Sequence, residues 1–216
     1  MTSASTQAAV FDMDGVLIDS GAHHREAWRT LLGELGITPA PDFWRLTIGR
    51  PAEEAVPLLL GRSVTRSEAV GLAERKRAHY VRLGGRGLAA IAGAPAFVRA
   101  LATRRVPRAV ATSASRLDLD RLLGALEIRE LFTTVVTSDD VRLGKPDPEV
   151  YVKAAAGLGV APTACVVFED SPVGVEAARR AGMRVIGLTT AHTEAELRAA
   201  GAERAISNFE GLSWPV

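Results

Sequence analysis

Short apolar runs that alternate with helical segments are the feature that most constrains the fold of this chain. Several of them are rich in valine and nearly free of polar residues: Ala8–Phe11, Arg108–Thr112, Thr134–Thr137, Ala164–Phe168 and Arg184–Leu188. A strand that is apolar throughout has to be covered on both faces. Strands that alternate with helices favour a parallel sheet, because each crossover between parallel strands is usually helical. The sequence therefore predicts an α/β fold with a doubly wound parallel sheet.

The helical segments between these runs have recognisable ends. Asp147 followed by Pro148 predicts a cap and a first helical position, and Ser171 followed by Pro172 repeats this pattern. Thr193 with a glutamate three residues later predicts a capping box. These signals place helices between the strands, as the predicted sheet requires.

Residues 20–90 break the alternation, because they contain no convincing strand. Apolar stripes at helical spacing predict helices over His23–Leu35, Glu53–Leu60 and Glu68–Leu83. A helical block inserted directly after the first strand is typical of a small lid. The sequence therefore predicts a core domain made of residues 1–19 and 91–216, with an inserted helical cap domain over residues 20–90.

Charge and cysteine content narrow the classes of function. A net charge of +1 gives no reason to expect a nucleic-acid or membrane partner. The single cysteine, Cys165, cannot form an intrachain disulfide, which fits a reducing compartment. No uncharged apolar stretch approaches the roughly 20 residues of a membrane span. Met1–Gln7 has neither the basic flank nor the apolar segment of a secretory signal. We expect a cytoplasmic protein.

Two carboxylates follow the first apolar run. Asp12 and Asp14 are separated by one residue, and Gly15 lets the backbone turn directly after them. Sheets of this kind bind ligands beyond the carboxyl ends of their strands, so a metal and a phosphate could meet both acids there. The pattern alone is only moderately specific, since surface turns also collect Asp and Gly.

Three further segments raise the specificity of this pattern. They occur in a fixed order along the chain: Ala111–Ser115, Gly144–Tyr151 and Phe168–Ala178. Together with Asp12–Ser20 they resemble the haloacid dehalogenase superfamily, in particular its helical-cap phosphatase and beta-phosphoglucomutase-like branch. This resemblance covers almost the whole chain, although the cap matches in layout more than in letters. It implies a Rossmann-like core and phosphoryl-transfer chemistry.

The resemblance also implies roles for individual residues. Asp12 corresponds to a nucleophile that forms an aspartyl-phosphate, and Asp14 to the group that protonates the leaving oxygen and later takes a proton from water. Lys145 supplies positive charge to the aspartate and the phosphate oxygens. Thr112 and Ser113 end a strand, so that their hydroxyl and backbone N–H groups can bind phosphate.

A metal site is implied as well. In the family, the acid at Asp170 holds Mg²⁺ together with the Asp12 carboxylate and the backbone carbonyl of Asp14. Mg²⁺ suits such a site, because it accepts one or two carboxylates beside phosphate and retains several waters. Glu169 is expected to be a direct or water-bridged ligand, and its alternative is a charge at the strand end that caps the helix after Ser171.

The cap contributes the remaining candidates. Ser20, in the linker, is expected near the substrate. His24 aligns with a histidine that beta-phosphoglucomutase relatives use in cap and substrate contacts, and an ordinary surface role is an equal alternative. Arg50 falls where the family's cap loop dips towards the active site. It is a candidate specificity residue, and the alternative is an ordinary exposed arginine.

The leading hypothesis is a Mg²⁺-dependent phosphatase that acts on a small phosphorylated metabolite, such as a sugar phosphate or phosphoglycolate. The chain is expected to be a monomer or a weak homo-oligomer. The alternative is a phosphomutase, but that family tends to carry a lysine just before the cap-loop glycine and an arginine three residues after it. This chain has Ile48 and Ala52 there, although Arg45 or Arg50 could substitute. A non-catalytic binding protein is less favoured, since Asp12, Asp14, Lys145 and Asp170 are all present.

Overall fold

A six-stranded sheet organises the molecule. The structure is a computed structural model that describes residues 7–84 and 88–216. All strand pairs are parallel, in the order β3-β2-β1-β4-β5-β6. The strands are β1 (Ala8–Phe11), β2 (Arg108–Ala111), β3 (Thr134–Val136), β4 (Cys165–Glu169), β5 (Arg184–Leu188) and β6 (Arg204–Ile206). The predicted doubly wound parallel sheet is confirmed.

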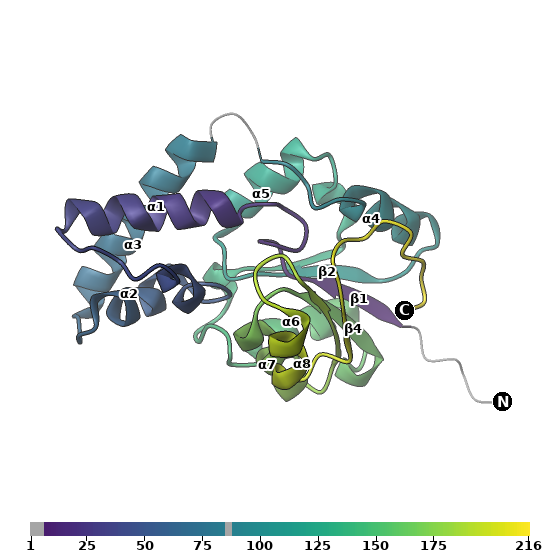
Figure 1. Cartoon of the computed structure of the whole chain (residues 1–216). Helices are drawn as coiled ribbons and strands as arrows, with labels where there is room; N and C mark the ends of the chain where they lie inside the picture. Colours follow the sequence, from purple (N-terminus) through teal and green to yellow (C-terminus); the bar gives the residue numbers. More distant parts are fainter. Residues whose placement is uncertain (1–6, 85–87) are drawn as a thin grey trace.

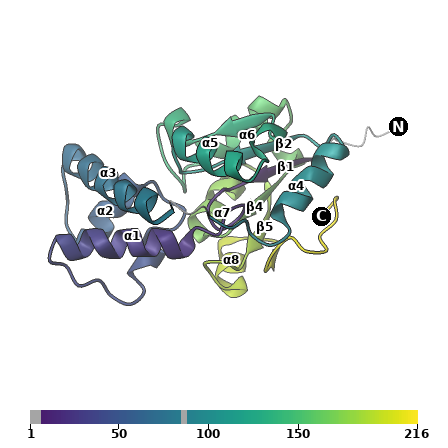
Figure 2. The ribbon, with the colours of Figure 1, turned by 90° about the horizontal axis from the view of Figure 1, so that it is seen from above.

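Helices cover both faces of this sheet (Figures 1 and 2). The helices that pack on it are α4 (Ala94–Thr103), α5 (Arg116–Ala125), α6 (Glu149–Leu158), α7 (Pro172–Arg180) and α8 (Glu194–Ala200). Short 3₁₀ turns lie between them: η3 (Arg129–Leu131), η4 (Ser138–Asp140) and η5 (Pro162–Ala164). In β1, Ala9 and Phe11 join one apolar cluster with α4 and α5, while Ala8 and Val10 join another with α6, α7 and α8. Alternate side chains of one strand thus serve two cores.

Three helices stand apart from the sheet at one end of the molecule (Figure 2). They are α1 (Gly21–Glu34), α2 (Ala52–Leu60) and α3 (Arg66–Leu83), with the 3₁₀ turn η1 (Phe43–Leu46) before α2. We call these four elements the cap helices. They share an apolar cluster of their own that includes Trp28, Leu32, Phe43 and Val56. The predicted cap region of residues 20–90 ends in a segment of which residues 85–87 lie outside the described part of the chain.

Most predicted helix ends agree with the structure. Ser115, Ser171 and Thr193 each accept a backbone N–H in the first turn of the helix that follows. The start of α6 is shifted by one residue: Pro148 occupies the cap position, and the Asp147 carboxylate accepts the N–H of Glu149 at 2.9 Å. This turn satisfies the same orphan donors by a different route.

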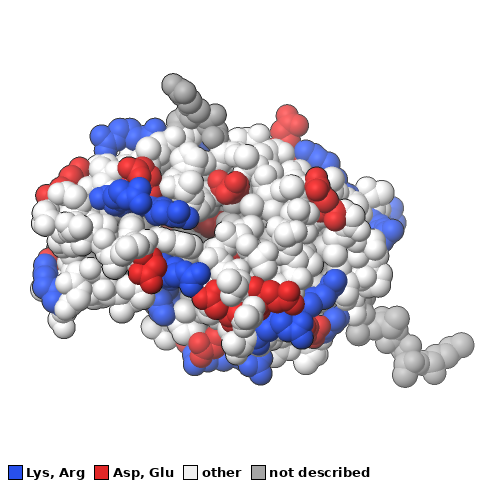
Figure 3. All heavy atoms as spheres, in the orientation of Figure 1, with Lys and Arg blue, Asp and Glu red and all other residues white. Residues whose placement is uncertain are grey.

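The remaining sequence expectations concern membrane spans, the first residues of the chain and surface charge. In the part of the chain that the structure describes, no helix is both long and apolar enough to cross a membrane. Met1–Gln7, where no secretory signal is expected, lies outside the described residues except for Gln7. On the face seen in Figure 3, Lys and Arg are interspersed with Asp and Glu, as the small net charge leads one to expect.

Candidate active site

A cavity of about 250 Å³ lies between the cap helices and the carboxyl ends of the strands. Asp12 follows β1 directly, Thr112 follows β2, and Asp170 follows β4, so the parallel topology brings all three to one edge of the sheet. Of the sequence-predicted site residues, those that line this cavity are Asp12, Asp14, Ser20, His24, Arg50, Thr112, Ser113 and Asp170. Lys145 and Glu169 are the two that do not, and both lie buried beside Asp12.

Lys145 joins two buried carboxylates. Its Nζ lies 2.7 Å from Asp12 Oδ1 and 2.6 Å from Glu169 Oε1, and all three side chains are at most 6% exposed. Burial raises the pKa of Asp12 to about 7 against the opposing effect of Lys145. Burial also disfavours the charge on Lys145, but Asp12 and Glu169 outweigh it, so the pKa of Lys145 lies well above its ordinary value. The ammonium group is therefore a fixed positive charge behind Asp12.

Glu169 is fully engaged with protein donors. Oε1 accepts from Lys145 and from the Tyr151 hydroxyl at 3.0 Å, and Oε2 accepts from the Ser171 N–H at 2.8 Å and its hydroxyl at 2.9 Å. The side chain is fully buried and faces away from the cavity. These contacts agree with the alternative of a strand-end charge beside Ser171 and anchor Lys145, while the role of Glu169 as a metal ligand stays a prediction.

Asp170 lies on the other side of Asp12 with little to neutralise it. Its Oδ2 lies 3.3 Å from the Thr190 hydroxyl, whose better partner is the Gly15 carbonyl at 2.7 Å. Burial, with the nearby charges of Glu169 and Asp12, raises the pKa of Asp170 well above its ordinary value. Gly15 has φ +72°, and a Cβ there would lie 1.9 Å from Asp170 Oδ2. Only glycine therefore lets the turn after Asp14 pass this carboxylate.

The donor set fits a divalent cation. Asp12, Glu169 and Asp170 are buried near one ammonium group, so that negative charges would outnumber positive ones if all three acids were ionised. A bound cation would favour the carboxylate forms of Asp12 and Asp170. Among residues 7–84 and 88–216, no three His, Cys, Asp or Glu side chains form a complete metal cluster. The set suits an ion that is coordinated by two carboxylates, a backbone carbonyl and non-protein ligands, and Mg²⁺ is such an ion.

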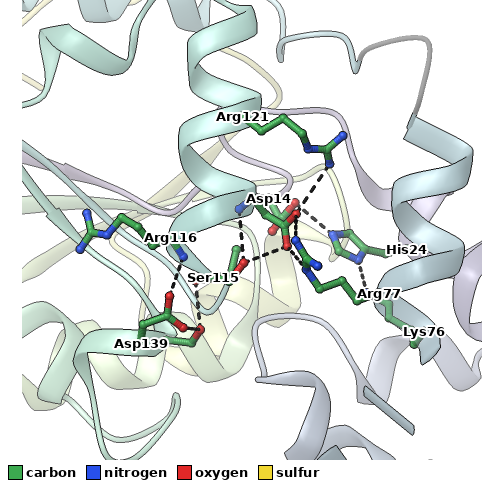
Figure 4. A network of polar contacts seen from close by, with 11 residues as sticks. Asp14, His24, Lys76, Arg77, Ser115, Arg116, Arg121 and Asp139 are labelled. Carbon is green, nitrogen blue, oxygen red and sulfur yellow. Dashed lines mark hydrogen bonds and ion pairs between the residues drawn. The ribbon is translucent and has the colours of Figure 1, made fainter. Parts of the chain in front are cut away.

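Asp14 is held by residues from the cap. Ser20 Oγ donates to its Oδ1 at 2.5 Å, and His24 Nε2 lies 3.1 Å from the same atom. On the far side of the ring, Lys76 Nζ lies 2.6 Å from His24 Nδ1, and Figure 4 shows Lys76, His24 and Asp14 in sequence. The Lys76 ammonium can only donate, so His24 accepts at Nδ1 and donates from Nε2. This arrangement defines the tautomer of the ring.

The pKa values of this group agree with that tautomer. Burial and the adjacent Lys76 lower the pKa of His24, so the ring is neutral near pH 7. Burial likewise lowers the pKa of Lys76 to about 8. For Asp14, burial raises the pKa, but the contacts with His24 and Ser20 outweigh it and the net shift is downward. Asp14 is therefore a carboxylate in this arrangement.

A cap loop reaches the strand ends of the core. The Ser113 hydroxyl donates to the Gly49 carbonyl at 2.9 Å, and Arg50, the next residue, lines the cavity. Gly49 has φ +76°, and a Cβ there would lie 2.2 Å from Ser171 Oγ. The close approach of two loops therefore depends on this glycine. The Thr112 hydroxyl accepts the N–H of Ala114 at 3.1 Å, which shapes the segment that was predicted to bind phosphate.

Sequence reasoning did not identify several residues that contact the site residues. Lys76 carried a signal, because it shares the buried face of α3 with Leu72, Ala73 and Tyr80 at helical spacing. A lysine on an apolar face needs a partner, and that partner is His24. Tyr151 and Thr190 gave no comparable signal, since one reads as core and the other as a loop residue.

Comparisons with known proteins agree with this geometry. The family model described as haloacid dehalogenase-like hydrolase matches residues 6–182. The chain is 37% identical over 214 residues to validoxylamine A 7'-phosphate phosphatase of Streptomyces hygroscopicus subsp. limoneus, covering 97% of each protein. It is 34% identical over 179 residues to a fructose-1-phosphate phosphatase of Escherichia coli, covering 82% of this chain and 93% of that protein.

A solved structure has the same fold. Beta-phosphoglucomutase from Clostridium difficile superposes with a TM-score of 0.85 at 25% identity, covering 96% of this chain and 93% of the other. The predicted Rossmann-like α/β fold and the expectation of an enzyme are therefore confirmed. By the extent of the family match and the identity to its relatives, the chain belongs to the haloacid dehalogenase-like hydrolase family.

Proposed function

We propose that this hydrolase is a Mg²⁺-dependent phosphatase that acts on a small phosphomonoester of the sugar phosphate or phosphoglycolate class through an aspartyl-phosphate. The observation that carries this proposal is the pairing of two acids in one cavity, each with a different partner. Asp12 is held by buried Lys145 at 2.7 Å, and Asp14 is held by Ser20 and His24. The two named relatives are both phosphatases.

In the first step, an Asp12 carboxylate oxygen attacks phosphorus and the ester oxygen leaves. Attack by an anion on an anionic ester needs positive charge beside it, and Lys145 supplies a permanent one. The Thr112 hydroxyl and the Ser113 N–H, directly after β2, bind the phosphate oxygens. The Thr112 N–H donates to the Val136 carbonyl and the Ser113 hydroxyl to the Gly49 carbonyl, so these two donors serve the fold. Glu169 and Tyr151 act only through Lys145, whose position they hold.

Asp14 moves the proton. As a carboxylate it takes a proton from the water that hydrolyses the aspartyl-phosphate, which returns Asp12 to its free form. To protonate the leaving oxygen in the first step it must itself carry a proton. The approach of a phosphate anion favours that form, because a like charge raises the pKa of a carboxyl group. Ser20 and His24 orient Asp14 for both steps.

Mg²⁺ would be held by the Asp12 and Asp170 carboxylates and the Asp14 backbone carbonyl. When bound, it neutralises charge on the phosphate and on Asp12. We further propose that residues 20–90 form a cap that shields the cavity from water and selects the substrate. Arg50 lines the cavity as a specificity residue, and Arg25 and Trp44 line it as well. A monomer or weak homo-oligomer and a cytoplasmic location stay predictions.

A beta-phosphoglucomutase-like phosphomutase is the second candidate, favoured by the structural similarity to an enzyme of that name. A mutase has to retain a bisphosphate intermediate, which requires cationic groups for its second phosphate. Ile48 and Ala52 stand where the mutase pattern has a lysine and an arginine. Of the two arginines that could substitute, Arg45 is paired with Glu196 at 2.5 Å, whereas Arg50 lines the cavity. These residues favour hydrolysis over isomerisation.

A substrate screen separates the two candidates. The purified protein with Mg²⁺ is incubated with sugar phosphates, phosphoglycolate and a hexose 1-phosphate with trace bisphosphate, and both inorganic phosphate and isomer are measured. We expect phosphate release from one or a few substrates and none from the Asp12→Asn variant. Formation of isomer without phosphate release would establish the mutase instead.

A further inference from the structure

A bidentate ion pair ties the cap to the core beside the cavity. Arg77 of α3 contacts Asp118 of α5 through Nε to Oδ2 at 2.8 Å and through Nη2 to Oδ1 at 3.0 Å. The Asp118 side chain is 11% exposed and the Arg77 side chain 42% exposed, so the carboxylate end of this pair is shielded from solvent. Both residues line the cavity, yet neither has a role in the proposed reaction.

The same carboxylate fixes the end of the proposed phosphate-binding segment. The Ser115 hydroxyl donates to Asp118 Oδ2 at 2.9 Å and accepts the N–H of Asp118 at 3.3 Å. Ser115 also lines the cavity and closes the segment that starts at Thr112. In Figure 4, Arg77 and Ser115 approach each other from the cap and the core. A displacement of Arg77 would therefore move Asp118 and, through it, Ser115 at the end of this segment.

The neighbouring residue on α3 reaches the other side of the cavity. Lys76 contacts His24, which contacts Asp14, whereas Arg77 contacts Asp118. Consecutive helical residues point about 100° apart, so one turn of α3 touches two parts of the site. The position of α3 therefore affects the proton-transfer group and the phosphate-binding segment together.

A second cap–core ion pair has the same construction. Arg45 of η1 contacts Glu196 of α8 at 2.5 Å, and Glu196 also accepts from the N–H and hydroxyl of Thr193. Asp118 and Glu196 each stand third in their helix, where they complete the contact with the capping residue. Because these carboxylates are already fixed by the core, little side-chain freedom is lost when the arginine docks.

We propose that Arg77 is a positioning residue that couples the docking of the cap to the ordering of the segment Thr112–Ser115. The proposal rests on the phosphatase function proposed above. The Arg77–Asp118 pair holds α3 against α5, so that the phosphate-binding segment takes its binding form only when the cap is docked. Without the pair, a smaller fraction of the substrate-free molecules has this segment in its binding form.

Kinetics of matched variants test the coupling. In Arg77→Gln we expect KM for the best substrate to rise about tenfold while kcat stays within about twofold, because apparent affinity scales with the competent fraction. Arg75→Gln is the control: Arg75 lies on the same helix but pairs with Glu34 inside the cap. Asp118→Asn, which retains an oxygen for Ser115, should match Arg77→Gln, and the double variant should add little.

Hydrogen exchange gives a readout independent of turnover. Without substrate, the amides of residues 112–118 should exchange faster in Arg77→Gln than in Arg75→Gln or the wild type, and Arg77→Lys should be intermediate. Equal exchange and equal KM in Arg77→Gln and Arg75→Gln would overturn the proposal, as would additive effects in the double variant. If the wild type has no phosphatase activity, the proposed function fails, while the exchange measurement still decides whether Arg77 orders the segment.

Discussion

At the scale of single residues, the most consequential side chain is Lys145. It is buried between two carboxylates, and both require it, since an unpaired buried charge is strongly unfavourable. Asp12 faces the cavity, whereas Glu169 faces Tyr151 and Ser171. One carboxylate of this trio thus lines the cavity, and we propose that the other holds the lysine.

Replacing Glu169 by glutamine tests this division of labour. Both carboxylate oxygens of Glu169 accept hydrogen bonds, whereas a glutamine amide has a single oxygen. Its NH₂ group would face Lys145 or Ser171, which are themselves donors. We expect Glu169→Gln to lower the free energy of unfolding by about 3–5 kcal/mol, the usual cost of breaking a buried ion pair. Urea unfolding followed by circular dichroism measures this change.

The control for this experiment is Glu203→Gln. Glu203 pairs with Arg184 on the surface at 2.9 Å, with side chains 47% and 40% exposed. Removing such a pair costs at most about 1 kcal/mol. Equal stability of the two variants would show that Glu169 is not an anchor.

Sequence reasoning named the residues of the proposed reaction but not all of the residues that hold them in place. Asp12, Asp14, Lys145 and Asp170 stand in motifs with a fixed order, so their convergence followed from the parallel topology. Tyr151 lies within a regular helix, and only the three-dimensional fold brings its hydroxyl to Glu169. The contacts of Glu169 depend on the fold in the same way. Glu169 contacts Lys145 and Ser171 while its neighbour Asp170 lines the cavity, because successive side chains at a strand end point in opposite directions.

At the scale of secondary-structure elements, helix starts are fixed by local capping. Thr193 and Glu196 form a reciprocal capping box at the start of α8. Hydrogen bonds from the Thr193 backbone and side chain, together with Arg45, lower the pKa of Glu196 from 4.5 to about 2. The carboxylate form is therefore favoured by folding.

This shift predicts a pH dependence. A pKa that is lower in the folded state contributes stability above the unfolded value, and the contribution is lost as pH falls from about 4.5 towards about 2. The stability advantage of the wild type over Glu196→Gln should therefore shrink between about pH 6 and about pH 3. Thermal unfolding across this range measures it, with Glu194→Gln, a surface residue two positions earlier, as the control. An advantage that is constant with pH would contradict the capping role.

Element boundaries were largely predictable from these local signals. The first five strands and helices α1, α2 and α3 agree with the expected ranges to within about two residues, because the apolar period and the capping residues indicate the same boundaries. Strand β6 was missed: it has only three residues, and none is fully buried, so the sequence lacks an apolar run. It pairs with β5 at the edge of the sheet, and its own composition does not indicate this pairing.

At the scale of the whole molecule, the two parts of the chain enclose the site together. The carboxylates come from strand ends, while His24 and Lys76 come from the cap helices and Arg50 from a cap loop. How the cap docks could not be predicted from sequence, since Arg77–Asp118 and Arg45–Glu196 join residues that are 41 and 151 positions apart. Such pairs have no local signature.

Binding of Mg²⁺ should stabilise the whole fold. The ion would neutralise buried carboxylates that the protein alone leaves unbalanced, and a ligand at 100 times its Kd adds about 2.7 kcal/mol. We expect Mg²⁺ to raise the Tm of chelator-treated protein. The Asp170→Asn variant should lose this rise, whereas Asp120→Asn, a surface control on α5, should retain it. An equal rise in both variants would place the ion elsewhere.

The central claim is that Asp12 itself accepts the phosphoryl group. The most direct test uses Asp14→Asn with p-nitrophenyl phosphate and Mg²⁺, because nitrophenolate leaves without protonation while hydrolysis of the intermediate lacks its base. After an acid quench and borohydride reduction, an aspartyl-phosphate is converted to homoserine, which peptide mass spectrometry locates. We predict homoserine at position 12 and none in the Asp12→Asn variant. Reduction at another carboxylate, or an equal yield without Asp12, would contradict the account.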